Sequence, residues 1–343
     1  MKRALVIRMS SLGDLILSTP VAEAIKKEIP NAFLAWIVEK NNAPVLANNP
    51  YVDEILIWDK SIAGILKLIR ALRRHKWDLC LDLQSLFKSA LFSLLSGAKV
   101  RIGLEKVERG SHIFYNFTLP NIPSFHALQN NLLSAYLSID FLKRGKIDIK
   151  KGLDKLYKAE GNFKPKIYPS PMEREKANEL IKGYLPFVAL CPGTTWESKR
   201  WNAKKWAELA DFFLEKHYKV VFIGGRKDIP HIREIKSYMR GNSLDLSGKT
   251  SILEAGCILE SAELAISVDS GAMHLATAVD TPVIALFGPT NPKIQGPYGE
   301  KNKVVYKGLS CSPCRRRECP AKDCMNLITT EEVIEQARVF LSF

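Results

Sequence analysis

Residues able to bind an anion follow one predicted strand in the last third of the sequence. An apolar run at residues 263–268 predicts a buried strand, and a helix is expected to begin behind a tight turn a few residues later. The strand end, the turn and the first helical turn carry Asp269, Ser270, Gly271 and His274. The first N–H groups of a helix lack intrahelical partners, so this arrangement can bind a phosphate. An ordinary strand–helix connection with internally bonded Asp and His side chains explains the same residues.

A second group of candidate anion ligands follows the predicted strand at residues 187–191. A Pro-Gly pair precedes the hydroxyls of Thr194 and Thr195, and the cation Lys199 comes a few residues later. Thr250 follows another short strand. Because the carboxyl ends of parallel strands lie at one edge of a sheet, these groups are predicted to gather where open α/β sheets bind ligands.

The N-terminal segment places a carboxylate in a comparable position. A short apolar strand at residues 4–7 is followed by Ser10, Ser11 and Gly13, and Asp14 then opens a helical pattern. Asp14 is therefore expected at a strand-to-helix junction that faces the ligand side of a sheet. A plain helix-capping role is the alternative, since Asp is a favoured N-cap residue.

Four cysteines stand close together near the C-terminus with the spacing C-x2-C-x4-C-x4-C. They are Cys311, Cys314, Cys319 and Cys324. Such a group indicates a metal site or a pair of disulfides. In a reducing compartment thiolate-bound Zn²⁺ is the better default, and disulfides and simple thiols remain the alternatives.

Positive charge is concentrated in the first half of the chain. The 343 residues carry a formal net charge of +14, and residues 1–170 hold 26 Lys and Arg against 15 Asp and Glu. This asymmetry favours an anionic partner, such as nucleic acid, a membrane surface or an acidic substrate. Solvated lysines on helix faces explain it as well. No helix-turn-helix, RNP or zinc-finger pattern supports nucleic acid, so none is expected as a partner.

The sequence contains no apolar run long enough to span a bilayer. Its N-terminus enters a strand directly, without the apolar core of a signal peptide. We therefore expect a cytoplasmic location.

Strands and helices alternate along the whole chain, which predicts an α/β protein with parallel sheets. At 343 residues the chain is long for one core, and a Lys- and Gly-rich stretch at 143–168 marks a boundary. We predict a first Rossmann-like domain at residues 1–165, a second at 166–325, and a C-terminal helix at 326–343 that packs back on the first. A poorly patterned region at 106–121 is expected to form loops that shape a binding pocket.

Four segments, in this order, resemble glycosyltransferase family 9, the ADP-heptose:lipopolysaccharide heptosyltransferases. They are RMSSLGDLILSTP, DLCLDLQSLFKSALFS with RIGL, PGTTWESKRW, and VDSGAMHLA followed by TPVIALFGPTNP. These segments lie between residues 8 and 292, and the resemblance extends over the chain from residue 4 to about residue 325. The resemblance implies a GT-B fold, in which two Rossmann-like domains with parallel sheets face a central cleft.

The resemblance also implies a reaction and a role for each candidate residue. Asp14 would be the general base of an inverting single displacement that moves L-glycero-D-manno-heptose from ADP-heptose to the Kdo region of a lipid A acceptor. Donor-binding residues would be Thr194, Thr195, Lys199, Thr250, Asp269, Ser270, Gly271 and His274. Acceptor-binding residues would be Ser10, Ser11, Gly13, Lys88 and His126. The donor-side glutamate of some members has no certain counterpart here, and Asp228 is the nearest candidate.

No metal is required for this reaction. The sequence contains no Asp-x-Asp motif, and a fixed cation with backbone N–H groups can stabilise a departing diphosphate instead. Any zinc at the four cysteines would be structural. The basic first half would hold the protein peripherally on the cytoplasmic face of the inner membrane, where the acceptor lies.

Two alternatives come from other classes. One is another GT-B nucleotide-sugar enzyme, such as a transferase for a different sugar or an epimerase. The other is a non-enzymatic protein that binds zinc and nucleic acid. The phosphate-binding loops count against the second.

Overall fold

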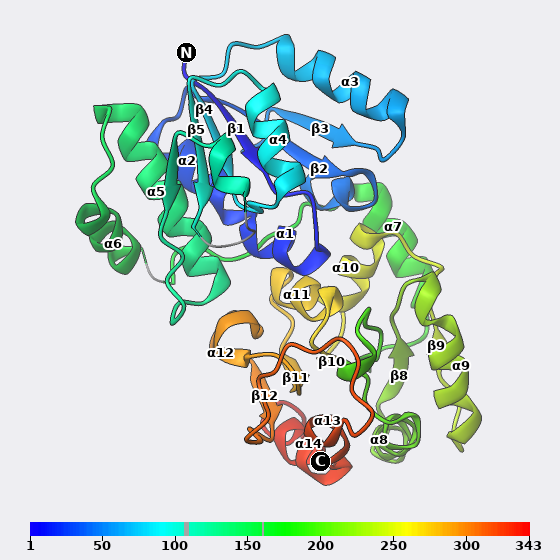
Figure 1. Ribbon diagram of the computed structural model, residues 1–343. Helices are drawn as coiled ribbons and strands as arrows, with labels where there is room; N and C mark the ends of the chain where they lie inside the picture. Colours follow the sequence, from blue (N-terminus) through cyan, green and yellow to red (C-terminus); the bar gives the residue numbers. More distant parts are fainter. Residues whose placement is uncertain (106–109, 160) are drawn as a thin grey trace. The chain divides into compact units, whose positions relative to one another are not determined.

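The computed structural model describes residues 1–105, 110–159 and 161–343 (Figure 1). The chain divides into two compact units, Met1–Tyr168 and Pro169–Phe343. This boundary lies close to residue 165, where the sequence predicted it.

The first unit is built on a sheet of six parallel strands in the order β3-β2-β1-β4-β5-β6. The strands are β1 (Arg3–Ile7), β2 (Phe33–Glu39), β3 (Glu54–Trp58), β4 (Leu79–Asp82), β5 (Val100–Leu104) and β6 (Phe117–Leu119). The α-helices are α1 (Leu12–Ser18), α2 (Pro20–Glu28), α3 (Ile62–Arg73), α4 (Phe87–Leu95), α5 (Ala127–Arg144) and α6 (Ile149–Lys158). Two 3₁₀ helices are η1 (Lys40–Leu46) and η2 (Ser111–Phe114).

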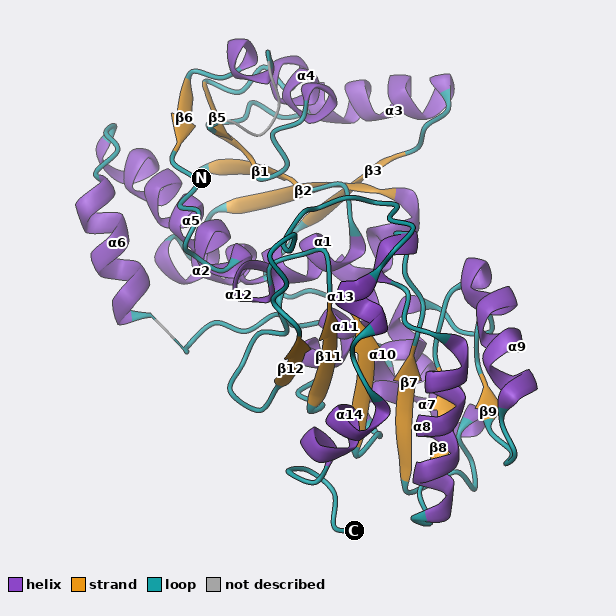
Figure 2. Cartoon of the chain, turned by 60° about the horizontal axis from the view of Figure 1, so that its bottom comes forward, coloured by secondary structure: helices purple, strands orange, loops and turns teal. Residues whose placement is uncertain are grey.

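The helices of this unit cover both faces of the sheet, with α3 and α4 on one face and α1, α2 and α5 on the other (Figure 2). Side chains alternate along each strand, so Leu5 and Ile7 of β1 pack in a cluster with Leu72 of α3 and Phe92 of α4. Burial on both faces explains why the central strands are apolar throughout.

One proline divides what the sequence presents as a single helical pattern. α1 ends at Ser18, and α2 begins with Pro20 at its first position. Proline is well placed there, because the first N–H groups of a helix have no intrahelical acceptor.

The second unit contains another sheet of six parallel strands, in the order β12-β11-β10-β7-β8-β9. The strands are β7 (Phe187–Cys191), β8 (Lys219–Phe222), β9 (Leu244–Asp245), β10 (Leu264–Val268), β11 (Val283–Phe287) and β12 (Lys303–Tyr306). The helices are α7 (Pro171–Leu180), η3 (Glu197–Lys199), α8 (Ala203–Glu215), η4 (Arg226–Asp228), α9 (Ile229–Tyr238), α10 (Ile252–Glu260), α11 (Gly271–Ala278), α12 (Pro292–Gln295), α13 (Asp323–Asn326) and α14 (Thr330–Ala337).

The two sheets share one strand order, although the two halves of the sequence contain no visible repeat. In each unit the first and fourth strands pair at the centre, β1 with β4 and β7 with β10. The chain runs from the first strand toward one edge and from the fourth toward the other. The carboxyl ends of the central pair are the point where this direction reverses, and such switch points are where open α/β sheets bind ligands.

Two predictions about the chain's organisation differ from the structure. The C-terminal residues 326–343 were expected to pack back on the first domain. Instead α14 contacts α8, β11 and β12, and Val333, Ala337 and Leu341 belong to the core of the second unit. The predicted loop region 106–121 contains η2 and β6, while its residues 106–109 lie outside the described part of the chain. In the described ranges, no helix combines the length and the apolar character needed to cross a bilayer.

Candidate active site

Asp14 lies in the first turn of α1, just after β1. Its carboxylate accepts hydrogen bonds from the Ser11 hydroxyl at 2.9 Å and from the Ser11 N–H at 3.3 Å. Arg8 Nη2 lies 3.0 Å from the other carboxylate oxygen, and the Asp14 side chain is 29% exposed. Asp14 therefore does take part in capping α1, as the alternative held. It also keeps a fixed orientation and solvent access, which a general base requires.

Arg8 is a residue that the sequence analysis did not select. Its guanidinium contacts Asp14 and also donates a hydrogen bond to the carbonyl of Leu83, just after β4. It therefore links the carboxyl ends of the two central strands and orients the carboxylate. The available signal was a cation directly after a strand, within RMSSLGD.

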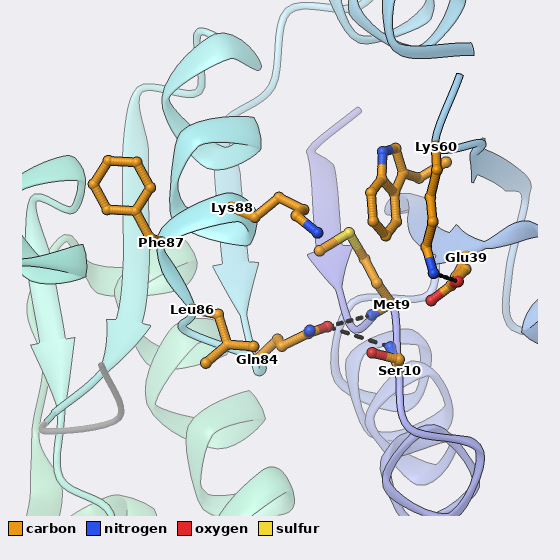
Figure 3. A pocket seen from close by; sticks show the side chains of 9 residues that line it. Met9, Ser10, Glu39, Lys60, Gln84, Leu86, Phe87 and Lys88 are labelled. Atoms are coloured by element: carbon orange, nitrogen blue, oxygen red, sulfur yellow. Dashed lines mark hydrogen bonds and ion pairs between the residues drawn. The ribbon is translucent and has the colours of Figure 1, made fainter. Parts of the chain in front are cut away.

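The five acceptor candidates fall into different environments. Ser10 and Lys88 line one pocket of the first unit (Figure 3). Ser11 donates its hydroxyl to Asp14, and Gly13 is buried in α1. His126 is the N-cap of α5, where its Nδ1 accepts a hydrogen bond from the Leu128 N–H at 3.2 Å. That capping bond gives His126 a structural role that needs no ligand.

The second unit holds a buried carboxylate paired with a cation at its switch point. Asp269 follows β10 and is 6% exposed. Lys199 Nζ lies 2.6 Å from Asp269 Oδ2, and the Thr290 hydroxyl donates to the same oxygen at 2.5 Å. The Lys199 ammonium also lies over the Trp196 ring, 4.4 Å from its centroid. The pair and the ring hold the cation in place before any ligand arrives.

Thr290 is a second residue that the sequence analysis did not select. It follows β11, so it obeys the same rule as the residues that were selected, namely a hydroxyl beyond the carboxyl end of a buried strand. Its bond to Asp269, together with the Lys199 pair, shows that the segments after β7, β10 and β11 meet at this edge.

The remaining residues predicted to bind the sugar donor follow strands that lie nearer to or farther from the Lys199–Asp269 pair. Ser270 is the N-cap of α11, Gly271 is its first residue, and His274 is buried within it. Thr194 and Thr195 follow β7, the strand that pairs with β10, so they belong to the same edge. Thr250 follows β9, the edge strand two places from β7.

Asp228 supports the loop after β7. A Cβ atom placed on Gly193 would lie 2.4 Å from the Asp228 carboxyl carbon, so the backbone at Gly193 and this carboxylate are in close contact. Asp228 also accepts a hydrogen bond from the Gly225 N–H at 2.8 Å. The residue thus joins the loops after β7 and β8, and only glycine leaves room for it.

The four cysteines are free thiols in this structure. The pKa of Cys324 is raised by burial and then by the charges of Cys314, Cys311 and Cys319, which therefore lie near it. Among the described residues, no three His, Cys, Asp or Glu side chains are arranged to hold a metal ion. This arrangement does not fit the predicted zinc site.

The cysteine-rich loop packs on the segment that carries Lys199. Ser198 donates from its N–H to the Arg317 carbonyl at 3.1 Å and from its hydroxyl to the Arg316 carbonyl at 2.6 Å. Arg315 N–H donates to the Pro289 carbonyl at 2.8 Å. The loop therefore ties the residue before Lys199 to the end of β11, and so helps to position the cation.

Comparison with known proteins gives consistent similarities. The family model of glycosyltransferase family 9 (heptosyltransferase) matches residues 65–325. Lipopolysaccharide heptosyltransferase 1 of Pseudomonas aeruginosa is 25% identical over 332 residues, covering 92% of this chain and 87% of that protein. The structure of Escherichia coli ADP-heptose lps heptosyltransferase II aligns with a TM-score of 0.81 at 24% identity, covering 99% of this chain and 98% of that one.

A further solved structure is E. coli heptosyltransferase WaaC with ADP-2-deoxy-2-fluoro heptose. It aligns with a TM-score of 0.71 at 20% identity, covering 98% of this chain and 99% of that one. These similarities confirm the predicted α/β class and GT-B fold.

Proposed function

Because the chain belongs to glycosyltransferase family 9, we propose that it transfers L-glycero-D-manno-heptose from ADP-heptose to the Kdo region of the lipopolysaccharide inner core. The observation that carries the proposal is the Lys199 ammonium held at the switch point of the second sheet, where a nucleotide diphosphate would bind. The lipopolysaccharide heptosyltransferases among the relatives support the acceptor class, and the WaaC complex supports the donor.

The second unit supplies the donor site in this proposal. Lys199, the hydroxyls of Thr194 and Thr195, and the first N–H group of α11 at Gly271 would contact the diphosphate. Negative charge grows on the diphosphate as its bond to the sugar breaks. A fixed cation in a partly buried site stabilises that charge more in the transition state than in the ground state, and so accelerates the reaction.

The first unit supplies the base. An acceptor hydroxyl would give its proton to the Asp14 carboxylate while its oxygen attacks the anomeric carbon from the face opposite the diphosphate. ADP leaves with the bonding electron pair, and the anomeric configuration is inverted. Arg8 would keep the carboxylate pointed in one direction during this transfer.

We propose that no metal ion takes part, because Lys199 and the N-terminus of α11 already carry positive charge to the diphosphate. A structural metal at the four cysteines remains a prediction. It would require their loop to move from the arrangement described above.

The test is a transfer assay with ADP-heptose and a Kdo-containing lipid A, with ADP release and the mass of the product as readouts. Donor binding alone is measured by thermal shift, where a ligand at 100 times its dissociation constant stabilises by about 2.7 kcal/mol. UDP-sugars serve as competing donors. Stabilisation and turnover with a UDP-sugar but not with ADP-heptose would replace this proposal with another GT-B sugar enzyme.

We also propose that the protein binds peripherally to the anionic cytoplasmic face of the inner membrane. Helices α3 and α4 lie on one side of the first sheet (Figure 2), and η2 contacts α4. These three elements and the residue after α3 carry exposed basic or apolar side chains. The basic ones are Lys67, Arg70, Arg73 and Arg74, and the apolar ones are Ile62, Leu66, Leu91, Leu94 and Ile113.

Charge attraction of this kind acts over about 8 Å at 0.15 M salt. Co-sedimentation with anionic vesicles should therefore be strong at low salt and largely lost at about 1 M. Binding that persists at 1 M salt, or that is equal on neutral vesicles, would show that the basic residues do not drive it.

A further inference from the structure

The cysteine-rich loop, residues 311–324, carries a run of three arginines that the proposed function does not use. They are Arg315, Arg316 and Arg317, and all three are exposed. Exposed arginines are ordinarily solvated surface residues. Arg317, however, lies against the segment that carries Lys199.

Both the backbone and the side chain of Arg317 are held at that segment. Its carbonyl accepts a hydrogen bond from the Ser198 N–H at 3.1 Å, which fixes the loop one residue before Lys199. Its guanidinium carbon lies 5.6 Å from the centroid of the Trp196 ring. A guanidinium at this distance is attracted to the face of an indole ring. The loop therefore brings a cation to the residues that follow β7.

The Trp196 ring attracts two cations, since the Lys199 ammonium lies 4.4 Å from the same centroid. Asp269 compensates the charge of Lys199 at 2.6 Å. Glu197, next to Trp196 in the sequence, is paired with a lysine of the cysteine-rich loop. In the described ranges of the chain, Arg317 has no carboxylate within ion-pair distance. Its positive charge is therefore the uncompensated one of this group.

The charge balance of the donor site calls for such a group. The charges of Lys199 and Asp269 cancel, so an anion that contacts Lys199 also meets the carboxylate beside it. A diphosphate is anionic before transfer. It gains a further negative charge when the bond from its oxygen to the anomeric carbon breaks and the electron pair stays on that oxygen. A second cation at the same ring offsets this charge, and a planar guanidinium can donate two parallel hydrogen bonds to phosphate oxygens.

We propose that Arg317 is a second cationic ligand of the donor diphosphate, which the cysteine-rich loop holds at the Trp196 ring. Lys199, with a side chain that is 12% exposed, contacts the diphosphate from the buried side, and Arg317 contacts it from the exposed side. The Arg317 contact strengthens as charge grows on the departing ADP, so it lowers the barrier as well as the dissociation constant. This assignment rests on the proposed function, since it takes the edge of the second sheet to be the donor side.

The first experiment measures ADP and UDP binding to the full chain by calorimetry. Both nucleotides contain the diphosphate, so the one that the wild-type protein binds more tightly serves as the probe. Arg317→Gln should weaken that probe about ten-fold or more, because a charge-assisted hydrogen bond is lost. Arg317→Lys keeps the charge without the planar fork and should recover part of the affinity. Probe binding that is unchanged in Arg317→Gln would overturn the proposal.

Two further variants separate a direct contact from other causes. Arg233→Gln removes an equal charge from an exposed position of α9 and serves as the matched control. A loss equal to that of Arg317→Gln would reduce the effect to overall charge and overturn the assignment. Adding Arg317→Gln to Lys199→Ala should still weaken the probe several-fold. No further loss in that background would show that Arg317 acts only by holding Lys199 in place, which would also overturn the assignment.

The transfer assay separates this proposal from the function on which it rests. In that assay Arg317→Gln should raise the KM for ADP-heptose and lower kcat, while the acceptor KM changes little. Weaker nucleotide binding in Arg317→Gln, in a protein that transfers no heptose, would leave the diphosphate contact in place and contradict the function. Heptose transfer with the same donor KM and kcat in the wild type and in Arg317→Gln would contradict the Arg317 contact alone.

Discussion

Asp82 and Asp269 occupy equivalent places in two sheets of the same strand order, and their surroundings differ. Each lies at the carboxyl end of the fourth strand of its unit, β4 or β10, and each is almost completely buried. Asp82 accepts hydrogen bonds from the N–H groups of Gln84 and Ser85, both at 2.9 Å, and from the Tyr115 hydroxyl at 2.7 Å. Asp269 is instead paired with the Lys199 cation and the Thr290 hydroxyl.

We infer from this difference what separates a structural carboxylate from the one that we place at the donor site. The donors around Asp82 are uncharged groups within the fold, and its burial raises its pKa. The partner of Asp269 is the Lys199 cation, which can also pair with a diphosphate. In the first unit the charged groups at this edge lie elsewhere. Asp14 pairs with Arg8 after β1, and Lys60 and Lys88 line a pocket. The position of a residue in the sheet therefore indicates whether it lies at the edge where ligands bind. The charge of its partner then indicates whether it is a structural or a ligand-site residue.

The largest expected effect is that of Asp14→Asn. Asn keeps the size and a capping oxygen but cannot take a proton, so turnover should fall by a factor on the order of 10² to 10⁴. ADP-heptose affinity and Tm should stay nearly unchanged. Asp148→Asn is the control, because Asp148 caps α6 through the Lys151 N–H and has no proposed chemistry. A matching response of the two variants would reduce Asp14 to a capping residue.

Lys199→Ala should have the next largest effect. The cation contacts the diphosphate in both ground and transition states, so the variant should lose about 1.5–3 kcal/mol of donor binding and should also slow transfer. Calorimetry with ADP-heptose measures the first, and Lys204→Ala, at an exposed position of α8, provides the control. An unchanged donor dissociation constant would remove Lys199 from the donor site.

Tyr115→Phe tests the structural side of the comparison. It removes one hydrogen bond to the buried Asp82 carboxylate and should lower the free energy of unfolding by about 1–3 kcal/mol. The affinity for ADP-heptose should not change. Thr290→Val removes the corresponding donor from Asp269 and should cost less stability, because Lys199 remains. Denaturant unfolding of both variants decides the order, and a larger loss for Thr290→Val would reverse our assignment of roles.

Glu28→Gln should have the smallest effect on the free energy of unfolding. It shows what an ion-paired carboxylate contributes when it is more exposed than Asp82 or Asp269. Burial raises the pKa of Glu28, and its ion pairs with Lys143 at 2.6 Å and Lys155 at 2.7 Å lower it. The ion pairs together outweigh burial, so the pKa of Glu28 in the folded state lies below 4.5. The contribution of the pair to stability is therefore present above pH 4.5 and is lost as the pH falls through the folded-state pKa.

The Glu28→Gln difference should be about 0.2–1 kcal/mol at pH 7, and it should shrink in acid and in high salt. Denaturant unfolding at pH 7 and pH 3 measures it. A difference that grows in acid would contradict the direction of the pKa shift.

The sequence allowed the parallel sheets and the strand ends to be predicted because buried parallel strands are continuous apolar runs bounded by small residues. Residues such as Asp269 and Thr194 could be selected by that rule alone. The pairs Arg8–Asp14 and Asp82–Tyr115 could not, since the first depends on side-chain direction and the second also on which parts of the chain become neighbours. His126 shows a different limit, because a histidine near a helix start matches a ligand and a cap equally well, and only the structure shows that its Nδ1 caps α5.

The shared strand order also has a kinetic consequence. Its central contacts join distant parts of the chain: Met9 and Gln84 are 75 residues apart, and Ser267 and Cys191 are 76 apart. Each sheet must therefore close a long loop across its middle before its core is complete, which makes folding slow. Until the fourth strand arrives, the first strand has an unpaired edge on which another chain can pair. Recovery of soluble protein during rapid synthesis should therefore depend on the rate of that closure more than on the stability of the finished fold.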